Sequence, residues 1–120
     1  MPRLSDTFLT RERAKTVKAW FDYKGVRFLI ASFHNEALQK ALRELPADAD
    51  EDTRYKVWCK HLFLAFEGLQ NDDGSDMADT MEARIILMRD YTELANLLIA
   101  FSQNSDNFLG EDAVVDELGN

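Results

Sequence analysis

The chain has 120 residues, of which 46% are hydrophobic, and its formal net charge at pH 7 is −8. This length fits one domain, and eight Phe with two Trp can fill a packed core, so a wholly disordered chain is excluded. The acidic charge argues against nucleic acid as the main partner, because its phosphates would be repelled.

A β-hairpin is predicted over residues 15–32. Apolar residues recur at every second position from Val17 to Tyr23, and the alternation resumes from Val26. The tetrapeptide Asp22-Tyr23-Lys24-Gly25 has Asp at the first turn position and Gly where a left-handed residue is wanted. Strands are therefore expected over 15–23 and 26–32. An isolated hairpin is marginally stable in water, so its apolar face must pack on other elements.

Four helices are predicted after the hairpin, near residues 35–45, 53–69, 80–90 and 92–104. Asn35 can cap the first helix, and Pro46 stops it. An acidic surface loop follows at 46–52. The second helix carries a broad apolar stripe, and Gly68 either ends it or permits a close crossing with a neighbour.

A short acidic turn connects the second and third helices and ends at Gly74, and Asp79 with Glu82 is typical of a capping box for the third helix. The turn also invites comparison with a calcium-binding EF-hand loop. With Gly74 at loop position 6, position 1 is Leu69 and position 12 is Thr80, and neither side chain is a suitable ligand there. A solvated turn between helices is the expected structure.

These elements predict a mainly α fold, in which a small helical domain with an N-terminal β-hairpin spans residues 1–104. An acidic, flexible tail is expected over residues 105–120. Gly68 and Gly74 are expected to mark the turn between the second and third helices. The core should gather the large apolar residues of the last three helices, namely Trp58, Leu62, Phe66, Ile85, Leu94, Leu98 and Phe101.

No catalytic or metal-binding motif stands out. Cys59, His61 and His34 fall short of a zinc site, because there is no second cysteine pair and no HExxH-like spacing. The 22 acidic residues contain no pair singled out as in a glycosidase, and a Gly-rich phosphate loop and a nucleophile elbow are absent from the sequence. We therefore expect no enzymatic activity, no metal and no cofactor.

The expected location is the cytoplasm. The single cysteine, Cys59, excludes an intramolecular disulfide and suits a reducing compartment. The first six residues contain no apolar signal core, and no run approaches the ~20 apolar residues of a membrane span. A membrane is therefore not an expected partner.

Two features bear on partner binding. Trp20, Phe33 and Phe108 either pack within the hairpin and helix contacts or line a groove for a partner, since exposed aromatic residues are typical interface anchors. The charge is also uneven, with a net +4 over residues 1–30 and −12 over residues 31–120. These two parts either attract each other within one fold or steer a head-to-tail contact between copies.

Four segments share a pattern: AWFDYKGVRFLIASFHNEAL (19–38), FEGLQNDDG (66–74), DTMEARIILMRDYTELANLLIAFSQNSDNF (79–108) and the final ELGN. The pattern consists of a strand pair opening with Trp-x-x-Tyr, a helix ending in an aromatic-x-Gly turn, an Asp-Gly loop and two closing helices. It resembles the tail assembly chaperones of long-tailed (siphovirus-type) bacteriophages and prophages. The resemblance covers residues 15–120, and many members of that family carry Trp where Phe66 stands.

The resemblance implies a non-enzymatic protein that binds the long helical tape measure protein, keeps it soluble and helps recruit tail tube subunits during tail assembly. It also implies that the protein acts in the host cytoplasm and is absent from the finished virion. Genes of this kind often make a longer product by a −1 ribosomal slip near their end. Leu118-Gly119-Asn120 can be encoded by a heptamer of the required form, so a programmed frameshift is a further hypothesis.

Two other classes of protein are alternatives. An acidic inhibitor or decoy of the anti-defence type would carry rows of carboxylates at phosphate-like spacing, whereas the acidic residues here cluster at 48–52, 72–79 and 111–117. A structural component of the virion tail would be found in purified particles, which distinguishes it from a chaperone.

Overall fold

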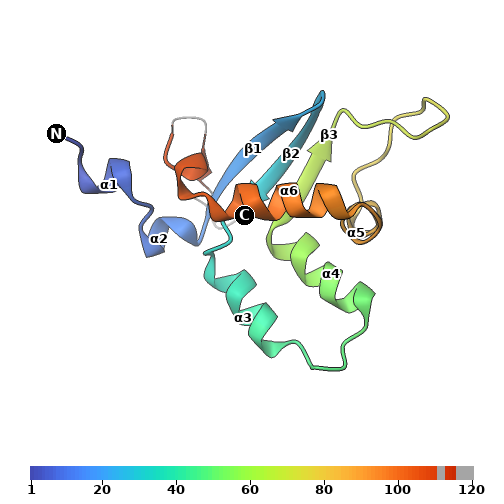
Figure 1. Cartoon of the computed structure of the whole chain (residues 1–120), viewed down its shortest axis with the longest axis horizontal. Coiled ribbons are helices and arrows are strands. Elements are labelled where there is room, and N and C mark those ends of the chain that lie inside the picture. The colour runs from blue at the N-terminus through green and yellow to red at the C-terminus, as the bar shows by residue number, and fades with distance from the viewer. Residues whose placement is uncertain (111–112, 116–120) are drawn as a thin grey trace.

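The computed structural model describes residues 1–110 and 113–115, which form a mixed α+β fold (Figure 1). An antiparallel sheet with the strand order β3-β2-β1-β4 packs one face on the helical layer. The elements in chain order are α1 (Leu4–Thr7), α2 (Arg11–Ala14), β1 (Val17–Tyr23), β2 (Val26–Ala31), α3 (Glu36–Glu44), α4 (Glu51–His61), β3 (Phe63–Glu67), α5 (Met81–Asp90), α6 (Thr92–Gln103), the 3₁₀-helix η1 (Ser105–Phe108) and β4 (Val114–Val115). The expected mainly α fold is wrong, because the sheet is a layer of the domain and not a hairpin attached to helices.

The predicted hairpin is confirmed, with β1 and β2 paired from Lys18 opposite Ala31 to Tyr23 opposite Val26. Its two-residue turn consists of Lys24 and Gly25, whose φ angles of +50° and +83° are both positive. Positive φ at both central residues defines a type I′ turn, which matches the twist of the flanking strands. Lysine is an unfavourable residue for the first of these positions, because its Cβ disfavours the left-handed region.

Replacing Lys24 by asparagine should therefore raise the free energy of unfolding by about 0.5–1 kcal/mol, since asparagine tolerates this conformation better. Equilibrium urea unfolding measures the change. Gly25→Ala is the matched control. No atom lies within 4 Å of a Cβ added at Gly25, so its expected loss of about 1 kcal/mol would come from backbone conformation alone. A destabilised Lys24→Asn variant would contradict this explanation of the turn.

The helix expected over 53–69 is also wrong. Helix α4 begins earlier, with Asp50 accepting a hydrogen bond from the Thr53 backbone N–H, and it ends at His61. Leu62 has φ −125° and ψ −57°, outside the helical region, and the chain continues as strand β3. The run Phe63-Leu64-Ala65-Phe66 suits a strand or a buried helix by composition, and pairing with β2, with Phe66 opposite Phe28, decides in favour of the strand.

One predicted helix cap is confirmed and another is wrong. Asn35 caps α3, as predicted, by accepting a hydrogen bond from the Leu38 N–H at 2.8 Å. Helix α5 is capped by Thr80, whose hydroxyl accepts from the Ala83 N–H, so the expected capping role of Asp79 is wrong. Asp79 instead accepts a hydrogen bond from the backbone N–H of Phe66 on β3. This contact joins the free edge of β3 to the start of α5.

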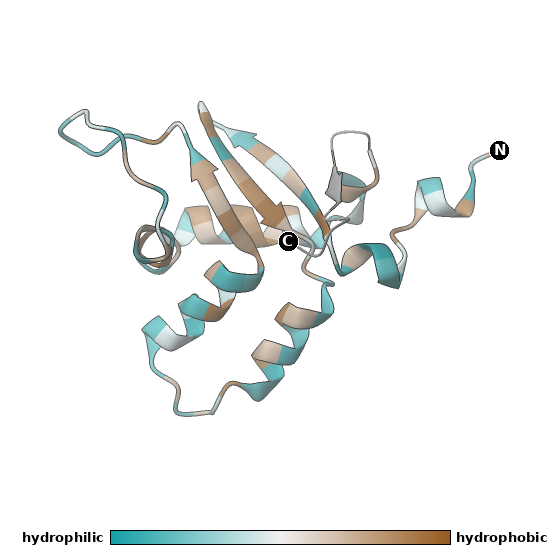
Figure 2. Ribbon diagram, turned by 180° about the vertical axis from the view of Figure 1, so that it is seen from behind, coloured by the Kyte–Doolittle hydropathy of each residue, from teal (hydrophilic) through white to brown (hydrophobic). Residues whose placement is uncertain are grey.

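The main core lies between the sheet and α4, α5 and α6. Apolar residues concentrate on the strands and on α6, while α3 and α4 alternate between hydrophilic and apolar residues and the loop after β3 is mostly hydrophilic (Figure 2). Of the residues expected in the core, Leu62, Phe66 and Leu98 are buried. The others are partly buried and pack against the same cluster, namely Trp58, Ile85, Leu94 and Phe101.

The segment after α6 takes part in the fold. Phe108 on η1 is fully buried against Val17 and Ala19 of β1, where it forms a second, smaller core. Strand β4 then pairs with Val17 and Lys18. Residues 105–108 and 114–115, which the sequence analysis assigns to the tail, thus form η1 and β4. Residues 111–112 and 116–120, including the Leu118-Gly119-Asn120 of the frameshift hypothesis, lie outside the described residues.

Candidate functional site

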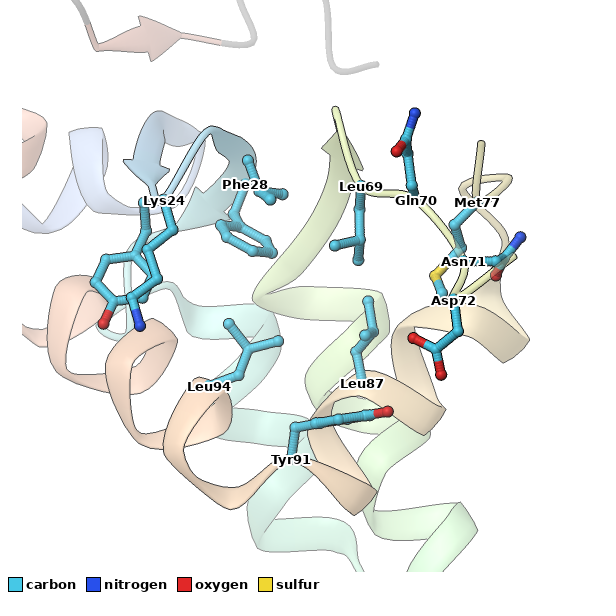
Figure 3. Close-up of a pocket in the computed structure, with 12 residues that line it drawn as sticks. Lys24, Phe28, Leu69, Gln70, Asn71, Asp72, Met77, Leu87, Tyr91 and Leu94 are labelled. Atoms are coloured by element: carbon cyan, nitrogen blue, oxygen red, sulfur yellow. The ribbon is translucent and has the colours of Figure 1, made fainter. Parts of the chain in front are cut away.

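A hollow of about 570 Å³ lies between the β1–β2 turn, the loop after β3 and the corner between α5 and α6 (Figure 3). Apolar and aromatic side chains supply most of its lining. The lining residues are Tyr23, Lys24, Val26, Phe28, Leu69, Gln70, Asn71, Asp72, Met77, Leu87, Tyr91 and Leu94. We call this hollow, together with its extension described below, the hairpin groove.

The loop of residues 68–78 forms one wall because it is folded as a small hairpin of its own. Gln70 and Asp76 form an isolated β-bridge, and the Met77 N–H donates to the Leu69 carbonyl at 2.9 Å. This bonding places two apolar residues of an otherwise polar loop side by side, both on the groove. At the tip of the loop, hydrogen bonds from Ser75 to Asp73 lower the pKa of the Asp73 carboxyl and hold the turn.

Gly68 joins this wall to the β1–β2 turn. Its φ is +85°, and a Cβ added there would lie 3.1 Å from the Gly25 carbonyl oxygen, closer than an ordinary van der Waals contact. Glycine is therefore favoured at this position for two reasons: it adopts positive φ without strain, and its lack of a Cβ lets the two turns approach closely. Gly74 also has positive φ, but it faces open space at the tip of the loop, where only its conformation matters.

The floor of the groove is continuous with the main core. Phe28 and Leu87 are buried, and Leu69 and Leu94 are partly buried above them. In Figure 3 these four side chains point toward a common space, from β2, α5, the loop and α6 respectively. Tyr91 lies at the rim with 58% of its surface exposed, which is unusual for a large hydrophobic residue in this chain.

The groove extends along the first turns of α6. A second hollow of about 310 Å³ shares Tyr23, Lys24, Tyr91 and Leu94 with the first and adds Leu97, one helical turn further on. The two hollows share these four residues and therefore adjoin each other, and Thr92 and Glu93 also line the second. The length of the groove along α6 suits an elongated ligand more than a compact small molecule.

The charged residues that line the two hollows are Asp72, Glu93 and Lys24. Asp72 lines the groove, and no Lys or Arg occurs between Lys60 and Arg84, a stretch that holds six acidic residues. Lys24 is the cation in the lining, with its Nζ 5.2 Å from the centre of the Tyr23 ring. A ligand with an apolar face and basic flanks would therefore be complementary to this surface.

The three aromatic residues expected at a partner surface do not line this groove. Trp20 points to the opposite face of β1 from Ala19 and Phe21 and is half-buried beneath the Arg27 guanidinium, 4.4 Å from its ring centre. Phe33 is half-buried and stacked on Trp58, and Phe108 is fully buried. The structure does not bring the three side chains together.

The sequence analysis did not predict the groove residues, because they come from four separate segments of the chain. One signal was present in the sequence, since Leu69 and Met77 are apolar residues on either side of an acidic turn. Side chains of this kind in a polar loop must pack against something or remain exposed, and their spacing places both at the base of the same turn.

The residues considered as metal ligands do not form a site. Within residues 1–110 and 113–115, no three His, Cys, Asp or Glu side chains gather as a metal site would require. Cys59 is fully buried, and burial raises the pKa of its thiol to about 12, which keeps it protonated and unreactive in the folded chain. Burial also lowers the pKa of His61, while His34 is exposed.

Comparisons with protein-family models, curated proteins and solved structures gave no match for this chain. In the described part of the chain, every helix is too short or too polar to span a membrane.

Proposed function

We propose that this chain is a tail assembly chaperone that binds an amphipathic helix of a tape measure protein in the hairpin groove. The observation that carries the proposal is the groove itself, which consists of two adjoining open hollows with a largely apolar lining beside the start of α6. Amphipathic helices bind such grooves through apolar anchors spaced three or four residues apart. The resemblance described above supplies the identity of the partner.

The surface charge supports the same role. A net charge of −8 keeps a protein with exposed apolar residues soluble at high copy number, because like-charged copies repel one another. The chain would hold the tape measure protein in soluble form in the host cytoplasm and help to bring in tail tube subunits. It would then leave before the virion is complete.

Co-expression with a tape measure protein from the same genome should raise the soluble yield of that protein and give a complex that is purified intact. Because apolar burial is not screened by salt, the complex should survive ~0.5 M NaCl. Tyr91→Asp should weaken binding about tenfold or more, since it places a charge at the apolar rim. Aspartate also suits the start of α6, so the variant should fold normally.

Ile86→Asp is the matched control. Ile86 is also a large exposed hydrophobic residue, lies on α5 and does not line the groove, so this variant should bind as the parent chain does. Equal loss of binding in both variants, or no gain in soluble tape measure protein with the parent chain, would refute the proposal. Dissociation in ~0.5 M salt would indicate an electrostatic complex of the decoy kind instead.

A further inference from the structure

The two edges of the sheet differ in how their backbone groups are satisfied. Strands β1 and β3 lie on opposite sides of β2 (Figure 1), and β4 covers only the start of β1. An edge strand presents N–H and C=O groups that can pair with another chain, so proteins usually block such edges. Here the edge of β3 is blocked by side chains, and part of the edge of β1 is open.

The edge of β3 is blocked by an ion pair. Leu64 and Phe66 are two residues apart, so their backbone groups point to the same side of the strand, away from β2. The Leu64 carbonyl accepts a hydrogen bond from Arg84 Nη1 at 2.7 Å, and the Phe66 N–H donates to the Asp79 carboxylate at 3.3 Å. Arg84 Nε lies 3.2 Å from that carboxylate. The two side chains thus supply the donor and the acceptor that a neighbouring strand would offer.

The outer side of β1 is open beyond Lys18. The two-residue turn makes Tyr23 and Val26 a hydrogen-bonded pair, and such pairs occur at every second position along the hairpin. Trp20 and Asp22 therefore direct their N–H and C=O groups away from β2, on the side where Lys18 meets β4. In the described part of the chain, nothing is hydrogen-bonded to these outward groups of Trp20 and Asp22.

The side chains along this open edge are mostly apolar. Trp20 is half-buried on the outer face of the sheet. Phe21 is partly buried on the inner face and stacks on Phe101, with ring centres 4.7 Å apart. Asp22 is the charged residue of the segment, and its carboxylate accepts a hydrogen bond from Arg27 Nε at 3.1 Å. Its charge is thus met within the chain and does not protect the edge.

We propose that the open edge of β1 pairs in antiparallel orientation with the same edge of a second copy. A two-fold axis beside Phe21 puts Trp20 of each copy opposite Asp22 of the other, so every outward N–H and C=O of these residues meets a partner. The two Phe21 rings then lie side by side and extend the stack with Phe101. The segment is its own complement in hydrogen bonds and in side chains, and this selects a second copy as the partner.

The contact is small, so the dimer should be reversible. One strand edge buries less surface than the ~1,200–2,000 Å² of a stable protein interface. Dimers should therefore form at high protein concentration and dissociate on dilution. Because the contact involves neither the hairpin groove nor a tape measure protein, it is independent of the function proposed above, and its test uses the purified chain alone.

Asp22→Pro tests the backbone contact. It removes an N–H that faces away from β2, so the bonds between β1 and β2 stay in place. Asp22→Ala is the matched control, because it also loses the carboxylate but keeps the N–H. In sedimentation velocity over a dilution series, the parent chain and Asp22→Ala should dimerise with similar dissociation constants. The constant of Asp22→Pro should be about tenfold or more higher, since each half of the dimer loses a hydrogen bond.

Disulfide formation tests the register. Affinity-tagged Trp20→Cys chains mixed with Asp22→Cys chains should form a heterodimer on mild oxidation, because opposite residues of a strand pair have Cα atoms ~5.5 Å apart, within the range of a disulfide. The control mixture replaces Asp22→Cys by Glu67→Cys, which is exposed on β3. The native Cys59 is fully buried and so is protected. The yield should exceed that of the control about tenfold or more.

A parent chain that stays monomeric throughout the dilution series would overturn the proposal. Equal yields in the two cross-linking mixtures would also overturn it, and so would a folded Asp22→Pro variant that dimerises as the parent does. The thermal transition of Asp22→Pro shows whether that variant folds, and if the transition is lost, the cross-linking yields decide.

Discussion

Replacing Arg84 by methionine should lower the free energy of unfolding by about 2–4 kcal/mol, because the variant removes the donor that three part-buried carbonyl groups share. The Arg84 Nη1 lies 3.0 Å from the carbonyl oxygens of Cys59 and Phe63 and 2.7 Å from that of Leu64. Its Nε is 3.2 Å from an Asp79 carboxylate oxygen, and the side chain is only 14% exposed. One guanidinium thus holds the end of α4, the start of β3 and the start of α5 together.

Urea unfolding measures this loss, with Arg89→Met as the matched control. Arg89 is also on α5, but its ion pairs with Asp52 and Asp90 involve largely exposed carboxylates, so its loss should change the unfolding midpoint little. Arg84→Lys should recover only part of the stability, because a single ammonium cannot reproduce the geometry of the guanidinium. Similar midpoints for the Arg84 and Arg89 variants would show that the three carbonyls do not depend on Arg84.

Replacing Phe66 by alanine should cost about 3–5 kcal/mol, the usual range for deleting a buried aromatic side chain, and enough to unfold a marginal domain. Phe66 is 4% exposed, lies opposite Phe28 in the sheet and packs against Phe63, with ring centres 6.0 Å apart. Loss of the ring leaves a cavity between the sheet and the helices that its neighbours cannot fill.

Two measurements check the Phe66 result. The urea midpoint should fall sharply, and the Cys59 thiol, which is fully buried in the native chain, should become reactive toward a thiol reagent at low denaturant concentration. Phe8→Ala removes the same ring from an exposed site just after α1, so its stability should be within about 0.5 kcal/mol of the parent. A cooperative Phe66→Ala variant with an unchanged midpoint would exclude Phe66 from the core.

Local patterns predicted the elements that depend on neighbouring residues. The hairpin and its Lys24-Gly25 turn follow from alternation and turn chemistry, and the Asn35 cap follows from one side chain reaching three residues ahead. Each of these signals lies within about ten residues of the structure it determines. Such elements form in the same way in most surrounding folds.

The strand β3 was not predictable in this way. Its apolar residues suit a helix that continues α4 as well as they suit a strand, and the choice depends on a free edge of β2 more than thirty residues earlier. The sequence did not predict the role of Asp79 for a similar reason, since its backbone partner Phe66 lies on β3, thirteen residues away. Tertiary pairing overrode local propensity at both places.

The candidate site was still harder to predict from the sequence, because its residues come together only through contacts between distant segments. Aromatic character suggested Trp20, Phe33 and Phe108, but the first lies under Arg27, the second stacks on Trp58 and the third fills the small core. Exposure, and not residue type, decides which apolar side chains can meet a partner. The groove became visible only when four segments were placed together.

The small core around Phe108 has a consequence for how the protein is made. Val17 and Phe108 are about 90 residues apart, so at synthesis rates of ~5–20 residues per second β1 leaves the ribosome roughly 5–20 s before Phe108 is available to cover it. The β1–β2 hairpin forms within microseconds, far sooner than that. During this interval Val17 and Ala19 lack the ring that buries them, so they can contact apolar residues of other unfinished chains. The newly made chain is therefore exposed to mispairing at this site during most of its own translation.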